Sequence, residues 1–353
     1  KIMICKKGLK LSNHENNLLK DLNLKNNKQI KYLGNYINYK GDWEYQINYA
    51  KNNGINNLSK ITRIKRKIPN IKIEMLNRIY FAVIESKALY GCEIWGMHDK
   101  ASIEINKIRN KYCKLILNIP VNAANIAARL EMGFTDVKIK LMEFALKFIL
   151  KRSNLNSNKL INKYIRDQII HTKSNYFKNI MYTLNKIGMG DCLNNSFIQD
   201  SNKLIINITN RIKDIINQEE RAKLNNYKSL TIFKLIKKGT EISQYLINPE
   251  ITNKQKIGLA WWRLGIRKLK NWRGNSENNK CILCNEEEDD NEHLILKCKM
   301  LNEIRNKYFD KHFFHIYTIT KNINYSNTKH IQKFGNFLFI VRELIKTEIK
   351  KHS

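Results

Sequence analysis

The sequence contains few residues that interrupt helices, and it contains no apolar segment long enough to span a membrane. Proline, the strongest helix breaker, occurs only 3 times in 353 residues, so long continuous helices are allowed. No apolar run approaches the roughly 20 residues that a membrane span needs. The most apolar stretch near the end, Phe337 to Val341, stops at Arg342. We therefore expect no membrane among the partners.

Acidic residues are scarce compared with basic ones, and most of the cysteines stand far from one another. Asp and Glu number 31 against 64 Lys and Arg, which gives a formal net charge of +33. Such an excess indicates a polyanionic partner. Four of the seven cysteines stand alone, which predicts reduced thiols and an intracellular compartment. These are Cys5, Cys92, Cys113 and Cys192.

The other three cysteines are crowded into the stretch CILCNEEEDDNEHLILKC. The spacing is C-x2-C-x8-H-x4-C, formed by Cys281, Cys284, His293 and Cys298. Thiolates and imidazole are the ligands that zinc prefers, and four protein ligands leave no position open for water. The pattern therefore predicts one structural Zn²⁺ ion. We interpret the acidic run Glu286 to Asp290 as a solvated loop, because no strand alternation surrounds it that could make it a catalytic carboxylate pair.

Hydrophobic spacing predicts a mainly α fold with a little β structure at the front. Two short strands are expected at residues 1–5 and 30–37, joined by a polar loop. Helices are expected from Trp43 and Asn70, from about Lys100 to Leu117, over most of the chain on to Tyr227, and near the C-terminus. The last two are predicted at about 299–312 and 328–350.

Two basic segments are candidate nucleic-acid contacts. The first is Arg63, Lys65, Arg66 and Lys67, which we place between two helices and which fits phosphate contacts and a solvated turn equally well. The second is LAWWRLGIRKLKNWRG, where cations alternate with aromatic rings, as single-stranded nucleic acid binding requires. At least one of Trp261 and Trp262 is expected in the core, and Trp272 is the better stacking residue. The cations of this segment are Arg263, Arg267, Lys268, Lys270 and Arg273.

Three stretches together resemble the C-terminal part of non-LTR (LINE-type) retrotransposon reverse transcriptases. IKYLGNYINYKGDWEYQI is similar to the family's KYLG segment at the end of the palm. ALYGCEIWG, KIRNKYCKLILNIP and ARLEMGF are similar to its thumb and the helices that follow. LAWWRLGIRKLKNWRG with the cysteine–histidine pattern resembles its terminal zinc module. The likeness covers most of the chain to about Arg305, but between Lys151 and Asn248 it extends to little beyond helices.

This resemblance implies the C-terminal portion of an RNA-directed DNA polymerase. The implied partners are template RNA, target DNA and an upstream polymerase domain, and the implied location is the nucleus. The implied parts are the palm end (1–40), a thumb-like helical region (41–125), a helical connector (126–255), the basic and aromatic segment with the zinc knuckle (256–312), and a helical tail (313–353).

The chain also departs from the family pattern. It contains no F/YADD-like aspartate pair, which the family places before the KYLG segment. It also lacks a complete restriction-like endonuclease pattern, because Glu348-Ile349-Lys350 matches only the second half and no Pro follows Cys298. We therefore expect no catalytic residues here, Mg²⁺ only in the missing palm, and no DNA synthesis by this chain alone. It opens on Lys1 rather than Met, which we interpret as a fragment. A stand-alone zinc-knuckle protein and a decayed remnant of such an element remain alternative interpretations.

Overall fold

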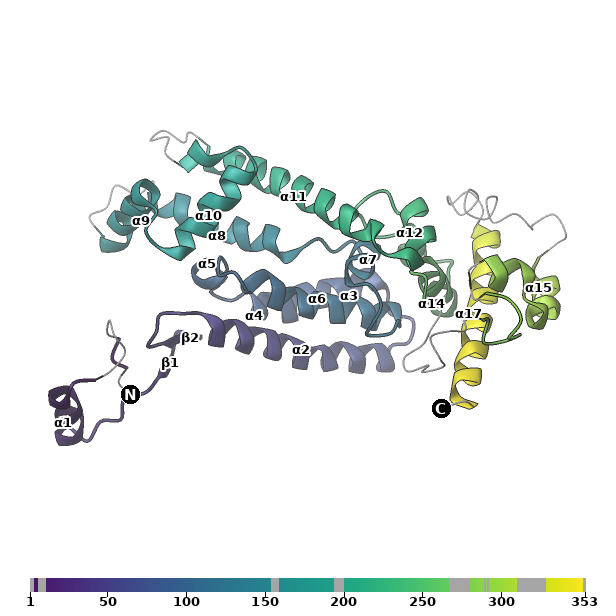
Figure 1. Cartoon of the computed structure of the whole chain (residues 1–353), viewed down its shortest axis with the longest axis horizontal. Coiled ribbons are helices and arrows are strands. Elements are labelled where there is room, and N and C mark those ends of the chain that lie inside the picture. Colours follow the sequence, from purple (N-terminus) through teal and green to yellow (C-terminus); the bar gives the residue numbers. More distant parts are fainter. Residues whose placement is uncertain are drawn as a thin grey trace. The chain divides into compact units, whose positions relative to one another are not determined.

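The computed structural model describes residues 3–5, 11–153, 159–193, 200–266, 280–288, 290, 292–309 and 328–351. These residues are mainly helical, and their two strands form one antiparallel sheet. The predicted mainly α fold is confirmed. None of the helices within these ranges is both long and apolar enough to cross a membrane. Figure 1 shows the elements.

The chain divides into two compact units, each assembled from three separate segments. Unit 1 comprises Lys1–Ile61, Ile79–Ile108 and Asp136–Ile216. Unit 2 comprises Thr62–Arg78, Arg109–Thr135 and Asn217–Ser353. The five parts expected from the sequence are not tested by this division and stay a prediction.

The predicted strands lie elsewhere than expected. Residues 3–5 belong to no strand, and the single strand expected at 30–37 is a hairpin of β1 (Gln29–Tyr32) and β2 (Asn35–Asn38). Leu33 and Gly34 form its turn with φ values of 44° and 86°. Two left-handed residues are what a two-residue hairpin loop requires, and glycine supplies one of them without strain. The turn therefore divides into two strands the segment 30–37, which the alternation of side chains had predicted to be one strand.

The polar segment before the hairpin is also more ordered than expected. It contains helix α1 (Asn13–Asp21), where a loop was predicted. Ser12 accepts a hydrogen bond from the Glu15 backbone, and the Glu15 side chain accepts one from the Ser12 backbone. This reciprocal capping satisfies two N–H groups that a helix start otherwise leaves unpaired.

Four helices and a short 3₁₀ turn build the main core of unit 1. They are α8 (Val137–Ser153), α9 (Leu160–His171), α10 (Asn175–Lys186), α11 (Ser201–Asn225) and η2 (Gly190–Leu193). Leu146, Ile180 and Ile208 are fully buried within one cluster of Ile, Leu, Met and Phe side chains. The apolar residues recur at helical spacing, so each helix contributes one face to this core. The sequence-based prediction of helices through Tyr227 is confirmed for the described residues.

The remaining long helices differ slightly from expectation. Helix α2 (Glu44–Lys67) is longer than predicted, and α6 (Ala101–Leu117) matches. The helix expected from Asn70 is α3 (Ile73–Ile79), which continues as a π-helical segment η1 (Tyr80–Glu85) and then α4 (Ser86–Ala88). The short α5 (Cys92–Trp95) follows.

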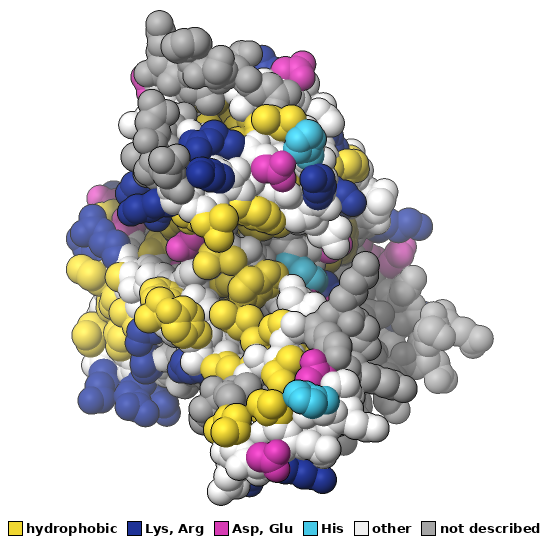
Figure 2. All heavy atoms as spheres, turned by 90° about the vertical axis from the view of Figure 1, so that its left-hand side faces the viewer, with side chains coloured by type: hydrophobic (Ala, Val, Ile, Leu, Met, Phe, Trp, Pro, Cys, Tyr) yellow, Lys and Arg dark blue, Asp and Glu magenta, His cyan; other side chains and the backbone are white. Residues whose placement is uncertain are grey.

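Unit 1 also contains a pocket with a volume of about 640 Å³. Its lining mixes rings, such as Trp43 and Tyr164, with the carboxylates of Asp42, Glu93 and Asp99. In Figure 2, hydrophobic side chains gather across the middle of the face shown, and many Lys and Arg side chains lie toward its edges.

A close helix crossing organises unit 2. Helix α14 (Asn253–Arg263) packs against α17 (Thr328–Lys351). A Cβ atom added at Gly258 would lie 2.7 Å from the Gly335 carbonyl oxygen and the Phe339 nitrogen. The two helices therefore approach so closely that only glycine fits at the contact. The shorter helices of this unit are α7 (Asn125–Glu131), α12 (Thr231–Ile236), α13 (Gln244–Ile247) and α15 (Asn302–Tyr308).

Candidate metal centre and basic surfaces

The four residues of the cysteine–histidine pattern converge in unit 2. One ligand atom from each of Cys281, Cys284, His293 and Cys298 lies within 4.8 Å of all the others. The Cys281 and Cys298 sulfurs are 3.9 Å apart, and the Cys284 sulfur is 3.2 Å from His293 Nε2. A zinc tetrahedron with Zn–S bonds of about 2.3 Å has sulfur–sulfur edges of about 3.8 Å. The group therefore could hold one metal ion.

Local backbone geometry brings the ligands together. The Asn285 N–H donates to the Cys281 carbonyl at 2.8 Å, and Asn285 has a left-handed φ of 55°, so a tight turn carries the first two cysteines. Of the other pair, His293 begins η4 (His293–Lys297), a single π-helical turn, and Cys298 is the C-cap of that turn. The Cys298 N–H donates to the His293 carbonyl at 2.7 Å. The five-residue step thus covers one turn of this wide helix, and both side chains reach the same site.

Two carboxylates of the acidic run support the histidine ligand. With Nε2 facing the sulfurs, His293 Nδ1–H donates to the Glu287 carboxylate at 2.7 Å. The His293 backbone N–H donates to Asp290 Oδ1 at 2.6 Å. A carboxylate on the outer nitrogen fixes the tautomer and orientation of a metal-binding imidazole.

The acidic run is therefore more than the solvated loop expected from the sequence. Glu286 to Glu288 are exposed, as predicted, but Glu287 and Asp290 also orient His293. Of these two contacts, only the one made by Asp290 could have been predicted from the sequence. An Asp at the start of a helix typically accepts a hydrogen bond from the backbone N–H three residues later. The Glu287 contact depends on the fold of the loop.

The environment shifts one of the ligands toward its metal-binding form and two others toward their protonated forms. The hydrogen bond from the Cys298 thiol lowers the pKa of Cys281 to about 5, and the same contact raises the pKa of Cys298. Burial acts to lower the pKa of His293, but hydrogen bonds with Glu287 and the two cysteines outweigh it and raise that pKa. A thiolate already stabilised at neutral pH is the form that binds metal.

A buried arginine anchors the centre to the following helix. Arg305 is 4 % exposed, and its Nε donates to the Ile295 carbonyl at 2.7 Å. Its Nη2 donates to the Cys298 carbonyl at 3.0 Å. These bonds connect α15 to the turn that carries the last two ligands.

The first basic segment lies within the last turns of α2, and not between two helices as expected. Arg63, Arg66 and Lys67 are exposed and are spaced three and four residues apart, so they share one face of the helix. We call these three residues the α2 basic face. Arg66 and Lys67 also lie in the last turn of α2, where cations stabilise the helix dipole.

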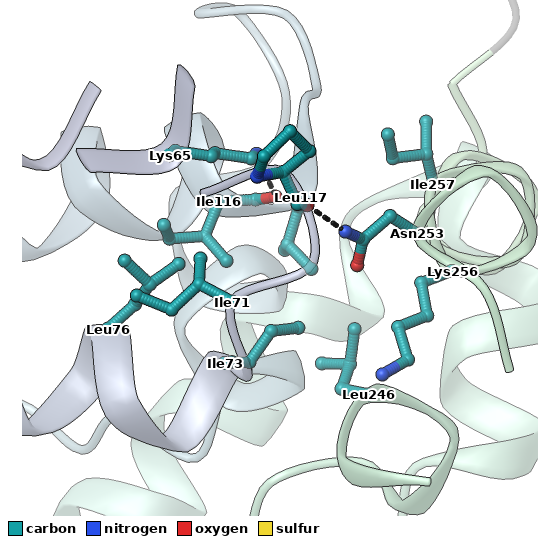
Figure 3. A pocket seen from close by; sticks show the side chains of 11 residues that line it. Lys65, Ile71, Ile73, Leu76, Ile116, Leu117, Leu246, Asn253, Lys256 and Ile257 are labelled. Carbon is teal, nitrogen blue, oxygen red and sulfur yellow. Dashed lines mark hydrogen bonds between the residues drawn. The ribbon is translucent and has the colours of Figure 1, made fainter. Parts of the chain in front are cut away.

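Lys65 belongs to a different environment from its neighbours. Its Nζ donates to the Ile116 carbonyl oxygen at 3.1 Å (Figure 3). It also donates to the Leu115 carbonyl oxygen at 3.3 Å, so both bonds lie at the end of α6. Burial lowers the pKa of Lys65. It therefore caps a helix end beside a small apolar pocket, and we remove it from the predicted phosphate contacts.

The prediction for Arg263 is also wrong. It was expected to face nucleic acid, but its side chain is 2 % exposed and pairs with the fully buried Glu131. Arg263 Nε donates to Glu131 Oε1 at 2.6 Å and Nη2 to Glu131 Oε2 at 3.2 Å. The Ser243 hydroxyl donates to the same carboxylate at 2.8 Å. A buried guanidinium held by a carboxylate has no access to phosphate, so its role is structural.

Both tryptophans beside Arg263 are core residues, since Trp261 and Trp262 are each 2 % exposed. The prediction that at least one of them is buried is confirmed. Trp262 makes an edge contact with Phe334 of α17, with ring centroids 4.9 Å apart. The remaining predicted contacts of this segment lie outside the described residues. These are Arg267, Lys268, Lys270, Trp272 and Arg273.

Comparison with known proteins adds no identification, because no protein family, curated protein or solved structure matches this chain. The functional interpretation therefore depends on the residues and geometry described above.

Proposed function

We propose that the chain is the nucleic-acid-binding C-terminal portion of a non-LTR retrotransposon reverse transcriptase, stabilised by one structural zinc ion. In this proposal it holds template RNA and target DNA in the nucleus, while a polymerase palm outside this sequence performs the chemistry. The observation that carries the proposal is the Cys281–Cys284–His293–Cys298 cluster in a chain with a net charge of +33. A closed metal module in so basic a chain is typical of nucleic-acid binding.

Zinc is the metal that the donor set favours. Three thiolates and one imidazole are soft or borderline donors, and their spacing fits tetrahedral coordination. With four protein ligands the ion would have no open position, so it would stabilise the local fold and would not act on a substrate.

Metal analysis tests the zinc assignment. We expect about one zinc ion per chain, as in other closed sites of this type. Cys298→Ser should lose the metal, while Cys5→Ser, which changes an exposed thiol outside the cluster, should keep it. Full zinc occupancy in the Cys298→Ser protein would refute the ligand set.

Glu287 offers a finer test of the same centre. Removing a carboxylate that orients a histidine ligand typically lowers metal affinity by about 10- to 100-fold. Glu287→Gln should show such a loss in a competition titration with a zinc chelator. Glu288→Gln is the matched control, because Glu288 is an exposed neighbour that pairs through its backbone with Lys280.

The nucleic-acid part of the proposal is supported by charge and by the α2 basic face. Arg63, Arg66 and Lys67 are exposed and spaced along one helix face, as phosphate contacts along a strand require. Binding should be tolerant of sequence and sensitive to salt, for RNA and single-stranded DNA alike. Filter binding with unrelated 20-nucleotide RNAs at several salt concentrations measures both properties.

The proposal also states what the chain does not do by itself. Polymerases clamp two metal ions with carboxylates on rigid strands, and neither β1 nor β2 contains an acidic residue. We expect no primer extension on an RNA template with dNTPs and Mg²⁺ or Mn²⁺. Extension that disappears when an acidic residue of this chain is mutated would refute this assignment.

A further inference from the structure

A pocket of about 250 Å³ in unit 2 is surrounded by positive charge. It lies between the C-terminal part of α11, helix α12 and the loop at 237–240. Four cationic side chains line it, together with apolar and neutral polar residues, and none of its described lining residues is acidic. The four cations are Arg221, Lys234, Lys237 and Lys238. We call these residues the α11–α12 basic pocket.

The cations are held in place by backbone carbonyls and not by carboxylates. Lys234 Nζ donates to the Asn225 carbonyl at 3.4 Å, and Lys238 Nζ donates to the Lys234 carbonyl at 3.4 Å. Arg221 donates to the Lys238 carbonyl, and Lys237 donates to the Glu241 carbonyl. Within the described part of the chain, none of the four forms an ion pair. No carboxylate lines the pocket among the described residues, although the charges of Glu131 and Glu241 act on Lys237 and favour its ammonium form.

Two further features suit an anion. Lys237 is partly buried, and burial lowers the pKa of its ammonium group, so a bound anion would relieve an existing cost. Asn217 lines the pocket, and its buried Oδ1 has no hydrogen-bond partner among the described residues. An amide can turn its NH₂ group toward a ligand, which would add a neutral donor.

We propose that the α11–α12 basic pocket binds a phosphate group. Ammonium and guanidinium groups that converge without an acid are the usual partners of phosphate oxygens. The volume lies below the roughly 300–1,000 Å³ of pockets that enclose whole small molecules, which favours a single phosphate over a complete nucleotide. The phosphate comes from an RNA backbone or from a free phosphate compound. The first source rests on the proposed function, and the second does not.

The test compares two double variants of equal net charge. Lys234→Gln with Lys238→Gln removes two pocket cations. Lys223→Gln with Lys228→Gln removes two exposed lysines that do not line the pocket, one in α11 and one in the short turn just before α12. Lys234→Arg with Lys238→Arg keeps the charge and should keep binding. Thermal unfolding of each protein confirms that the variants are folded.

The first arm uses a 20-nucleotide oligouridylate in fluorescence anisotropy. Each phosphate contact on a single strand contributes about 0.7 to the slope of log K against log salt, so losing two should reduce the slope by about 1.4. At 0.15 M salt this corresponds to roughly tenfold weaker binding. The control variant should change far less.

The second arm uses inorganic phosphate, followed by calorimetry at constant ionic strength. A phosphate signal that the pocket variant loses and the control keeps, with RNA binding unchanged, would assign the site to a free phosphate compound. Failure of the wild-type chain to bind RNA would refute the proposed function, and this second arm would still decide the pocket. If both double variants behave alike toward both ligands, the pocket inference is wrong.

Discussion

The α2 basic face and the segment at the end of α14 are both rich in basic residues, but the fold exposes the first and buries Arg263 of the second. Arg63, Arg66 and Lys67 are exposed, whereas Arg263 is 1 % exposed and bonded to Glu131. The difference comes from what each helix packs against. The α2 basic face has no described carboxylate partner, while α14 is enclosed by α17 and by the chain around Glu131. A basic residue in a sequence therefore indicates a surface only where the fold leaves its side chain exposed.

The largest expected effect is on stability, from Arg263→Ala. Removing one partner of a buried ion pair leaves the other charge unpaired and costs about 3–5 kcal/mol. Arg66→Ala, the same change on the α2 basic face, should stay within about 0.5 kcal/mol. Urea unfolding measures both.

Equal losses in these two variants would break the comparison. The double variant Glu131→Leu with Arg263→Met serves as a control, because it removes both charges together. It should recover much of the stability that Arg263→Ala loses, since replacing a whole buried pair by apolar residues is often close to neutral.

A second, smaller effect concerns packing of α14. Gly258→Ala places a methyl group 2.7 Å from backbone atoms of α17, so the helices must separate. Such overpacking costs about 1–3 kcal/mol. Lys254→Ala on the exposed side of the same helix should cost under about 1 kcal/mol, because it loses at most a weak contact with the Phe339 ring. Unchanged stability in the Gly258→Ala protein would show that α14 is not enclosed as described.

The pH dependence sharpens the same contrast. Burial opposes ionisation of Glu131, but the charge and hydrogen bonds of Arg263 outweigh it and hold the pKa of Glu131 below its ordinary value of 4.5. A lowered folded-state pKa contributes stability above the unfolded value, and that stability is lost as pH falls through the folded pKa.

The stability difference between the natural protein and Glu131→Gln should therefore be constant above about pH 5 and shrink below pH 4.5. Urea unfolding between pH 3 and pH 7 measures this difference. Both proteins keep the same cysteine–histidine cluster, so acid release of a metal bound there affects them equally and cancels in the comparison. A difference that grows toward acid pH would contradict the assigned ion pair.

The smallest effect on stability, and the clearest on binding, comes from the α2 basic face. Changing Arg63, Arg66 and Lys67 to Gln removes three phosphate contacts, so the salt slope for single-stranded RNA should fall by about 2. Stability should change by less than about 0.5 kcal/mol per site, because none of the three is buried. The matched control changes Lys223, Lys228 and Lys254 to Gln. An unchanged slope in the first variant would remove the α2 basic face from the nucleic-acid surface.

Some features of this protein followed from local sequence. Scarce proline and regular apolar spacing predicted the long helices, and α6 and α17 have nearly the predicted bounds. The cysteine–histidine spacing predicted which four residues meet, because one turn and one helical step are local geometry. The hairpin was predicted as one strand because the alternation of side chains continues across Leu33 and Gly34, where the structure has a left-handed turn.

Other features depended on contacts between distant parts of the chain. Glu131 lies 132 residues before Arg263, and no local pattern shows that they meet. Lys65 reaches a helix end 50 residues away, and the α11–α12 basic pocket joins a helix end to a loop of unit 2. Sequence alone determined the helical character, the charge and the four residues of the candidate metal centre, since these depend on composition and short spacing. Only the tertiary structure decided which cations are exposed, because burial depends on what packs against each helix.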